Sequence, residues 1–374
     1  MKWSLPIKVL QIGMTKNWGG TETYLMQQYK NLNRDLIVYD FVNITAENEM
    51  VFADYIRNNG SKIFETCSRH KNPIKHYYQW VSILRNYGKD YKAIVLNSNS
   101  LEYVFPLYIA RFLGIPIRVI HSHNAGFGHR IGIFRKLLIW VNKILLKFSA
   151  THYFACSQKA GLWMFDKDRK FKVIHNAIEV EEFLFNKNIR NILRKELKIE
   201  NSFVIGHVGS FNYQKNHEFL IRVFNEIQKI KSNAKLMLVG DFVGDDSYWN
   251  LTKKLVKELG IEDKVLFLGL RKDVPKLMQA MDCFLLPSRF EGLPLVGIEA
   301  QASGLPCFFA DTITEELGIT ELAHYISLDE TPKAWAEKIC NHSDLERNNM
   351  SEQIKQAGYD IKAEIIKIEE FYTS

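Results

Sequence analysis

Short apolar runs alternate with longer amphipathic stretches along most of the chain. The apolar runs, such as 7–13, 93–97 and 117–123, suit strands that are buried on both faces of a parallel sheet. The stretches between them, such as 75–86, have the apolar spacing of helices that cover a sheet. This order predicts an α/β fold with parallel sheets.

The alternation falls into two halves. Strands are expected again at 203–209, 235–240, 265–269 and 283–286, with helices between them, for example at 217–230. Residues 179–201 are rich in charge and are predicted to be irregular, so the domain boundary is placed there. We therefore expect an N-terminal domain at 1–178 and a C-terminal domain at 179–359, with a helix at about 360–374 that packs back on the first.

The stretch 287–300 follows a predicted strand and leads into a predicted helix. Gly292 and Pro294 lie in its loop, Glu299 lies in the helix, and Gly304 with Pro306 ends that helix. The first N–H groups of such a helix have no acceptor within it, and its dipole favours negative charge at this end. The pattern predicts a binding site for an anion such as phosphate.

Two other positions lie where open α/β sheets bind ligands. Gly19 and Gly20 follow the first strand, either to let a ligand approach the backbone or to form an ordinary tight turn. His123 ends the strand 117–123, and both a structural and a functional role are open for it. His121, two residues earlier, is expected to support it or to belong to the core.

Composition narrows the class of protein. The 374 residues are 47% hydrophobic and 24% charged, which is typical of a globular chain with a large core. The five cysteines are scattered without a C-x-x-C pair, so neither a disulfide framework nor a structural zinc site is expected, and a cytoplasmic location fits best. Neither a signal peptide nor a membrane-spanning segment is expected.

The formal charge of +7 indicates an anionic partner. Since we find no nucleic-acid-binding motif, an anionic small substrate or an anionic membrane surface remains. The stretch 131–148 reads as a basic amphipathic helix containing Arg135, Lys136, Lys143 and Lys147. Either its apolar face packs on the sheet of the first domain, or the helix lies on anionic lipid as a peripheral contact with the inner face of the plasma membrane.

Asp166-Lys167-Asp168 has the spacing of a metal-binding D-x-D motif. It follows a predicted helix in a charged turn, which favours a solvated loop. We therefore expect no metal and no other cofactor.

Taken together, these motifs resemble those of the retaining, nucleotide-sugar-dependent glycosyltransferases of group 1, also called family 4, which include enzymes of capsular and exopolysaccharide synthesis. The resemblance covers nearly the whole chain. It rests on Gly19-Gly20-Thr21-Glu22, His121-Ser122-His123, Val208-Gly209 with Gln214-Lys215-Asn216, Leu266-Phe267-Leu268-Gly269, and Pro287-Ser288 through Glu291-Gly292 to Glu299-Ala300. It implies the GT-B fold, in which two Rossmann-like domains with parallel sheets face each other across a cleft.

The resemblance also implies roles for single residues. Glu299 is expected to bind the ribose of the donor, Glu291 the transferred sugar, and Lys215 the phosphate that leaves. Arg271 is expected near the base and His123 under the donor sugar. The remaining expected donor contacts are Gly19 and Gly20 at the phosphates, and the backbone from Gly292 through Leu293 and Pro294 to Leu295 at the sugar and pyrophosphate.

Two positions depart from the family pattern. Ser210 stands where many relatives have Arg, which removes one of two cations expected at the phosphates, and Gly240-Asp241-Phe242 replaces the usual Gly-Asp-Gly. A charge-assisted contact contributes about 1.5–3 kcal/mol, so the first departure affects catalytic strength more than fold.

The expected function is transfer of a sugar from a nucleotide diphosphate donor, with UDP favoured, to a glycan or lipid-linked acceptor in surface polysaccharide synthesis. A nucleotide-sugar hydrolase or epimerase of the same fold, or a non-catalytic nucleotide-sugar-binding scaffold at the membrane, are the alternatives.

Overall fold

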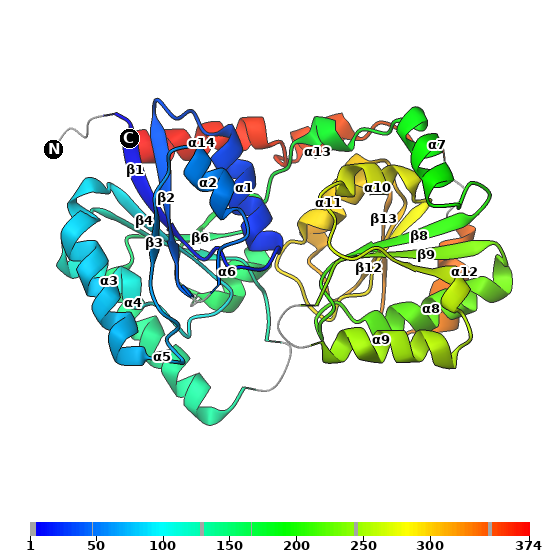
Figure 1. Cartoon of the computed structure of the whole chain (residues 1–374), viewed down its shortest axis with the longest axis horizontal. Helices are drawn as coiled ribbons and strands as arrows, with labels where there is room; N and C mark the ends of the chain where they lie inside the picture. The colour runs from blue at the N-terminus through cyan, green and yellow to red at the C-terminus, as the bar shows by residue number, and fades with distance from the viewer. Residues whose placement is uncertain (1–4, 47, 128–130, 166, 243–245, 343–345) are drawn as a thin grey trace. The chain divides into compact units, whose positions relative to one another are not determined.

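The computed structural model describes residues 5–46, 48–127, 131–165, 167–242, 246–342 and 346–374 (Figure 1). The chain forms two compact units. Unit 1 consists of Met1–Ala177 together with Ile361–Ser374, and unit 2 consists of Ile178–Asp360. Among the described residues, no helix combines the length and the apolar composition that crossing a bilayer requires.

Unit 1 is built on a seven-stranded sheet with the order β3-β2-β1-β4-β5-β6-β7, in which neighbouring strands run parallel. The strands are β1 (Ile7–Ile12), β2 (Ile37–Asn43), β3 (Ile63–Glu65), β4 (Ala93–Ser98), β5 (Ile117–Ser122), β6 (His152–Ala155) and β7 (Lys172–Val173). Successive strands are added on one side of β1 up to β3, and on its other side from β4 onward. The position between β1 and β4 is the topological switch point of the sheet, where open α/β sheets bind ligands.

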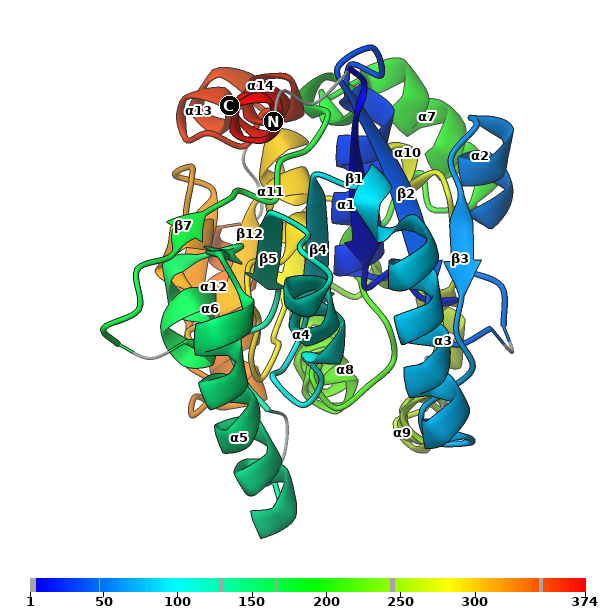
Figure 2. The same ribbon diagram turned by 90° about the vertical axis from the view of Figure 1, so that its left-hand side faces the viewer.

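Helices cover both faces of this sheet. They are α1 (Gly20–Asn31), α2 (Ala53–Asn58), α3 (Pro73–Tyr87), α4 (Phe105–Phe112), α5 (Ile133–Ser149), α6 (Gln158–Met164) and α14 (Ile361–Thr373). Right-handed crossovers place α1 and α2 on one face and the neighbouring helices α3, α4 and α5 on the other (Figure 2). Helix α14 packs against α1, and Glu369 accepts a hydrogen bond of 2.7 Å from the backbone N–H of Asn33.

Unit 2 has a six-stranded parallel sheet with the order β10-β9-β8-β11-β12-β13. Its strands are β8 (Phe203–Val208), β9 (Ala234–Val239), β10 (Val265–Phe267), β11 (Cys283–Leu286), β12 (Cys307–Ala310) and β13 (Ala323–Ile326). The topological switch point of this sheet lies between β8 and β11, because β9 and β10 are added on one side of β8 and β11 to β13 on the other. The loops after β8 and β11 therefore lie side by side at the switch point. Both units are therefore Rossmann-like.

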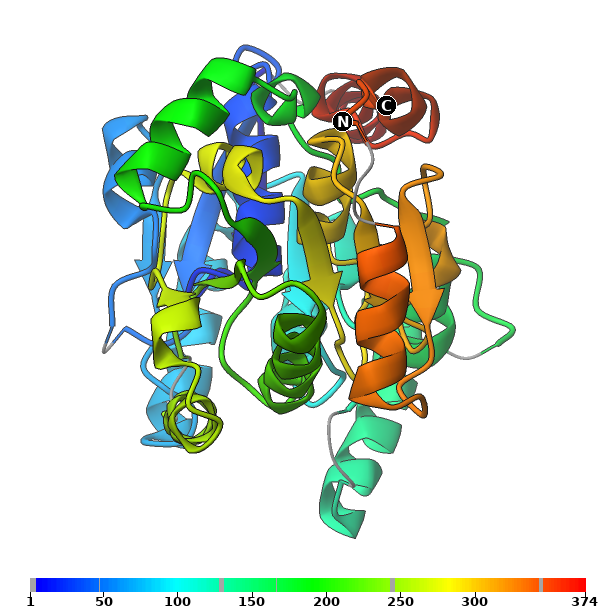
Figure 3. The ribbon, with the colours of Figure 1, turned by 90° about the vertical axis from the view of Figure 1, so that its right-hand side faces the viewer.

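The helices of unit 2 also form two layers (Figure 3). They are α7 (Lys187–Glu196), α8 (His217–Ile230), α9 (Ser247–Glu258), α10 (Val274–Ala280), α11 (Leu295–Ala302), α12 (Pro332–Asn341) and α13 (Ser351–Gln356). Helix α8 packs between α9 and α12 on one face, whereas α10 packs with α7, and α11 with α13, on the other.

The prediction of an irregular stretch at 179–201 is wrong, because it contains α7. The charges that suggested a loop instead attach this helix to the unit. Arg190 and Arg194 lie one turn apart and both bind the carboxylate of Asp282, which also accepts a hydrogen bond of 2.7 Å from the N–H of Val204. The buried end of α7 thus depends on ion pairs that are remote in sequence.

Candidate functional site

Helix α11 begins at the carboxyl end of unit 2's sheet. Pro294 is its N-cap residue, no side chain caps the helix, and the Pro294 carbonyl accepts a hydrogen bond of 3.0 Å from the N–H of Gly297. Of the four backbone positions expected to bind an anion, Pro294 has no N–H, so only Gly292, Leu293 and Leu295 could donate. The dipole of α11 favours an anion at this end.

Lys215 and Glu291 come from the two loops that meet at the switch point of unit 2. The Nζ of Lys215 lies 2.7 Å from Oε1 of Glu291, and both side chains are largely buried. The amide nitrogen of Gln214 donates to the other carboxylate oxygen, Oε2, at 2.8 Å. Both oxygens of this buried carboxylate are therefore hydrogen-bonded, as burial of a charge requires.

The two loops are joined by further contacts. The N–H of Arg289 donates to the carbonyl of Gln214 at 2.8 Å, and the guanidinium of Arg289 donates to the carbonyl of Tyr213 at 2.6 Å while it lies over the Tyr213 ring. Gly209 provides room for Lys215, because a Cβ at Gly209 would lie 3.0 Å from Cε of Lys215. The ammonium group is thus placed by backbone geometry as well as by its charge.

Glu299 lies on α11 and only 6% of its surface is exposed. Burial, together with the smaller effect of the nearby Glu182, raises the pKa of its carboxyl to about 7. A ligand that donates hydrogen bonds to this carboxylate would favour its charged form and lower the pKa. A vicinal diol such as that of ribose has two such donors.

Arg271 and Ser210 complete the expected residues of unit 2. Both carboxylate oxygens of Asp273 bind the guanidinium of Arg271, at 2.7 Å each, which raises the pKa of Arg271 and lowers that of Asp273. Arg271 is half-exposed beside this partner. Ser210 is half-buried in the loop after β8, next to Gly209.

Sequence reasoning missed two buried histidines beside Lys215. Nδ1 of His207 lies 2.8 Å from the carbonyl oxygen of Leu285, and the ring of His217 stacks on Phe211 with centroids 4.1 Å apart. Burial lowers the pKa of His207 to about 4 and that of His217 well below its usual value, and Lys215 adds to both effects. Both rings are therefore neutral near pH 7 and add no positive charge next to Lys215. In the sequence, His207 stands out only as a polar residue among the apolar positions of β8, and His217 only as the first residue of α8.

In unit 1, His123 follows β5 and binds Asn97 at the end of β4. Nε2 of His123 lies 2.9 Å from Oδ1 of Asn97, while the Asn97 amide nitrogen donates to the carbonyl of Ile12 and to Gln11, each at 3.0 Å. Because the Ile12 carbonyl can only accept, Oδ1 must be the acceptor for His123, whose Nε2 therefore carries the proton. Burial lowers the pKa of His123 to about 3, so the ring is neutral and its Nδ1 is an acceptor.

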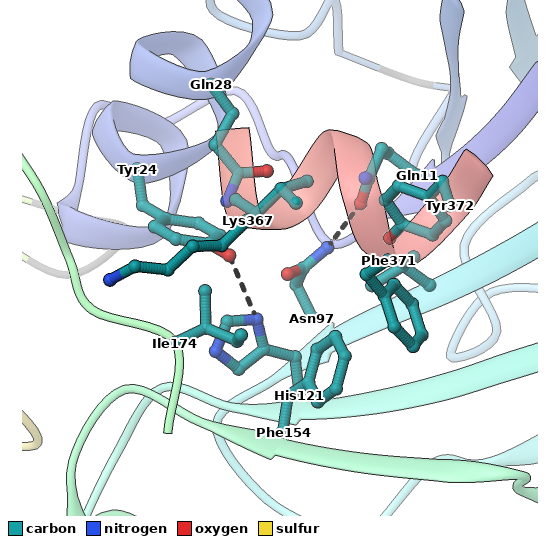
Figure 4. Close-up of a pocket in the computed structure, with 12 residues that line it drawn as sticks. Gln11, Tyr24, Gln28, Asn97, His121, Phe154, Ile174, Lys367, Phe371 and Tyr372 are labelled. Atoms are coloured by element: carbon teal, nitrogen blue, oxygen red, sulfur yellow. Dashed lines mark hydrogen bonds between the residues drawn. The ribbon is translucent and has the colours of Figure 1, made fainter. Parts of the chain in front are cut away.

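A small buried cavity lies beside His121 (Figure 4). Its lining includes Tyr24, His121 and, from α14, Lys367 and Tyr372. The hydroxyl of Tyr24 and Nδ1 of His121 are 3.3 Å apart, and burial holds the pKa of His121 well below its usual value. The cavity measures about 10 Å³, room for at most one water, so His121 supports the core as predicted and this cavity is not a substrate pocket.

Gly19 is the N-cap residue of α1 and Gly20 is its first residue. Neither has a positive φ, and a Cβ at Gly20 would meet nothing within 4 Å. Local packing therefore does not explain the absence of a side chain at Gly20. Glu22 in the same turn accepts hydrogen bonds from the N–H and the hydroxyl of Thr15, at 3.1 and 2.8 Å.

Within the part of the chain that the structure describes, no group of three or more His, Cys, Asp or Glu side chains could hold a metal ion. Asp166 lies outside the described residues, so the D-x-D motif is not tested.

Comparison with known families matches residues 188–360 to the family model described as "Glycosyl transferases group 1". The matched range lies in unit 2 and contains Lys215, Glu291 and Glu299.

Two curated proteins are similar over most of the chain. The putative glycosyltransferase EpsF of Bacillus subtilis is 29% identical over 96% of this chain and 94% of its own length. A protein of Escherichia coli named UDP-Gal:alpha-D-GlcNAc-diphosphoundecaprenol alpha-1,3-galactosyltransferase is 27% identical over 82% of this chain and 79% of its own length.

Among solved structures, Anabaena Alr3699/HepE in complex with UDP and glucose superposes with a TM-score of 0.81. The superposition covers 98% of this chain and 100% of that one, at 19% sequence identity. At this identity the likeness establishes the fold, which is the two-domain GT-B fold predicted from the sequence.

Proposed function

We propose that this chain, whose residues 188–360 match the domain of the group 1 glycosyltransferases, transfers a sugar from a UDP-linked donor to a lipid-linked glycan with retention of anomeric configuration. The proposed setting is the synthesis of a surface polysaccharide. One relative carries in its name both a UDP-sugar donor and a diphosphoundecaprenol acceptor.

One observation carries the donor part of the proposal. Within unit 2, the cation of Lys215, the carboxylate of Glu291, the start of α11 and the buried Glu299 all lie in or next to the two switch-point loops. We assign Lys215 and the α11 start to the diphosphate, Glu291 to hydroxyls of the transferred sugar, and Glu299 to the ribose hydroxyls. Arg271 is assigned to the region of the base.

We further assign His123 to the donor sugar, and Gly19 and Gly20 to its phosphates. The neutral ring of His123 offers an acceptor at Nδ1, which suits a sugar hydroxyl better than a cation would. The missing side chain of Gly20 leaves backbone open to a phosphate oxygen.

The chemistry follows from these assignments. The bond between C1 of the sugar and the diphosphate breaks while the acceptor hydroxyl approaches C1 from the same face, and the acceptor proton passes to the departing phosphate oxygen. Negative charge develops on the diphosphate, so Lys215 and the dipole of α11 stabilise the transition state more than the ground state. These two groups can perform this task without a metal ion, as we expect, although Ser210 contributes no charge there.

The exposed surface of α5 supports a lipid-linked acceptor. Phe134 is 84% exposed and Ile133 is 78% exposed, whereas Asn142, Leu146 and Ser149 form the buried side. The interpretation that the broad apolar face packs on the sheet is therefore wrong, because only a narrow stripe of the helix does so. An exposed apolar surface of this kind indicates an interaction site.

The start of α3, which follows β3, also exposes apolar side chains at the carboxyl edge of the unit 1 sheet. Ile74 and Tyr78 are 82% and 71% exposed. The carboxylate of Glu102 binds Arg135 of α5, and its carbonyl accepts from Arg69 in the loop before α3. His123 follows β5 at this carboxyl edge. A lipid-linked acceptor held at the membrane would reach the edge that presents His123.

The charge of this region supports an anionic membrane as the partner of this surface. Residues 66–149 contain 13 Lys and Arg but only two Asp and Glu, Asp90 and Glu102, whereas the whole chain has a net charge of +7. Exposed aromatic side chains among lysines are typical of binding at the interface of anionic bilayers. We therefore place the protein in the cytoplasm, peripherally on the inner face of the plasma membrane.

A panel of nucleotide sugars tests the function. The preferred donor should raise the melting temperature by mass action, equally with and without EDTA, and should yield glycosylated product when a polyprenyl-diphosphate sugar is added. Rapid and complete release of free sugar without acceptor would instead indicate a hydrolase. Binding of the donor without either reaction would indicate a scaffold.

A further inference from the structure

Gln214 and Lys215 bind different carboxylate oxygens of Glu291. The amide nitrogen of Gln214 is 2.8 Å from Oε2, while Nζ of Lys215 is 2.7 Å from Oε1. The backbone of Gln214 is fixed independently, since its carbonyl accepts the N–H of Arg289 at 2.8 Å. Gln214 therefore stays in position whatever Lys215 binds.

The two partners of Glu291 respond differently to a diphosphate. An ammonium group is strongly attracted to phosphate oxygens, so a diphosphate at the α11 start competes with Glu291 for Lys215. A neutral amide has no comparable attraction. Glu291 has only 6% of its surface exposed, and a buried carboxylate that loses its donors is strongly destabilised.

Resting on the proposed function, we propose that Gln214 is a positioning residue that keeps Glu291 hydrogen-bonded and oriented toward the transferred sugar while Lys215 engages the donor diphosphate. Gln214 itself touches neither the diphosphate nor the reacting atoms. It acts on donor affinity through Glu291 alone, and its amide remains on Oε2 while sugar hydroxyls replace Lys215 at Oε1.

A purely structural role for Gln214 would give a different result. The loops are already joined by Arg289, which binds the carbonyls of both Tyr213 and Gln214. If Gln214 only added to that junction, its loss would lower the stability of the protein to the same extent whether or not residue 291 is charged. If it compensates the charge of Glu291, its effect on nucleotide affinity must disappear when that charge is removed.

A double-mutant cycle on the full chain separates these roles. Calorimetry measures the dissociation constant of UDP for the wild type, for Gln214→Met, for Glu291→Gln and for the double variant. We expect Gln214→Met to weaken UDP binding about tenfold in the wild-type background, since a hydrogen bond to a buried charge is lost, and less than twofold in the Glu291→Gln background. Gln214→Ala repeats the cycle with a smaller side chain if the Met variant does not fold. Tyr213→Phe, which alters the neighbouring hydroxyl only, is the matched control and should bind UDP as wild type does.

Equal effects of Gln214→Met in the two backgrounds, or no effect in either, would overturn the proposal and leave the proposed function intact. If wild type binds neither UDP nor GDP, ADP or TDP, the proposed function fails, and the proposal for Gln214 fails with it.

Discussion

Nζ of Lys215 lies 2.7 Å from Oε1 of Glu291, so the residue assigned to the leaving phosphate is paired with the residue assigned to the moving sugar. Both come from loops that follow the two switch-point strands, β8 and β11. A donor that uses both residues must exchange this ion pair for contacts of its own. Part of the binding energy of the phosphate is therefore offset by the loss of the pair.

We expect Glu291→Gln to bind UDP more tightly and to turn over UDP-sugar more slowly. The neutral amide no longer competes with the diphosphate for Lys215, so affinity for UDP should rise about fivefold, or about 1 kcal/mol. The rate should fall because the charged contact to the sugar is lost. Calorimetry with UDP and steady-state rates with UDP-sugar measure the two effects, and parallel losses in both would argue against the exchange.

Glu299→Gln should stabilise the fold at high pH while weakening donor binding. The folded-state pKa of about 7 lies above the usual 4.5, so the folded protein retains a proton that the unfolded chain has released between these pH values. The contribution of Glu299 to stability therefore falls as pH rises through this window and stays low above it. Chemical denaturation at pH 8 should show the Gln variant more stable by about 3 kcal/mol, with the difference vanishing near pH 4.

The same carboxyl should release a proton when a UDP-sugar binds near pH 6.5, because ribose hydroxyls favour its charged form. A UDP-sugar has no terminal phosphate, so the ligand releases no proton of its own at this pH. Calorimetry in buffers of different ionisation enthalpy would detect this release. If the Glu299→Gln variant releases the same number of protons, Glu299 does not bind the ribose.

Asn97→Asp should make His123 titrate near neutral pH. With Asn97, burial holds the pKa of His123 at about 3, and the ring stays neutral above pH 5. A carboxylate in place of the amide oxygen at 2.9 Å would stabilise the imidazolium and raise the pKa above about 5. The Cε1 proton of His123 should then shift between pH 5 and 8 in NMR spectra of the variant but not of wild type. An unchanged spectrum would show that the Asn97 contact does not control this ring.

Membrane binding should depend on the cations beside the exposed apolar side chains of α3 and α5. Lys75→Glu together with Lys136→Glu should reduce co-sedimentation with vesicles containing 30% phosphatidylglycerol about tenfold or more, since each lysine near an anionic surface contributes about 1 kcal/mol. Lys254→Glu with Lys333→Glu, two exposed lysines of unit 2, is the control with the same change in charge. If neither pair alters binding and the protein elutes as a dimer, this surface is instead an interface between two copies.

The alternation of strands and helices was predictable because buried parallel strands are continuously apolar, and both sheets confirm it. Helix α7 was not predictable, because Arg190 and Arg194 read as solvent-exposed charge until Asp282 is placed beside them. The choice between the two interpretations of α5 also needed the structure, since periodicity shows that a helix is amphipathic but not how much of its apolar side is covered.

Part of the candidate site could also be predicted from the sequence, and part could not. Its loop, glycine and helix-start positions follow from local patterns, whereas the Gln214 contact joins residues 77 positions apart and leaves no local signal. The raised pKa of Glu299 depends on burial, and the tautomer of His123 on a hydrogen-bond chain through Asn97 to Ile12, neither of which a linear sequence displays.

In the proposed reaction, unit 2 stabilises the departing diphosphate through Lys215. The most direct test is the steady-state rate of UDP-sugar turnover by Lys215→Ala at saturating donor, with far-UV circular dichroism to establish that the variant is folded. We expect a loss on the order of 10²–10³-fold, as for removal of a group that stabilises developing charge. A folded variant that turns over donor at the wild-type rate would contradict this proposal.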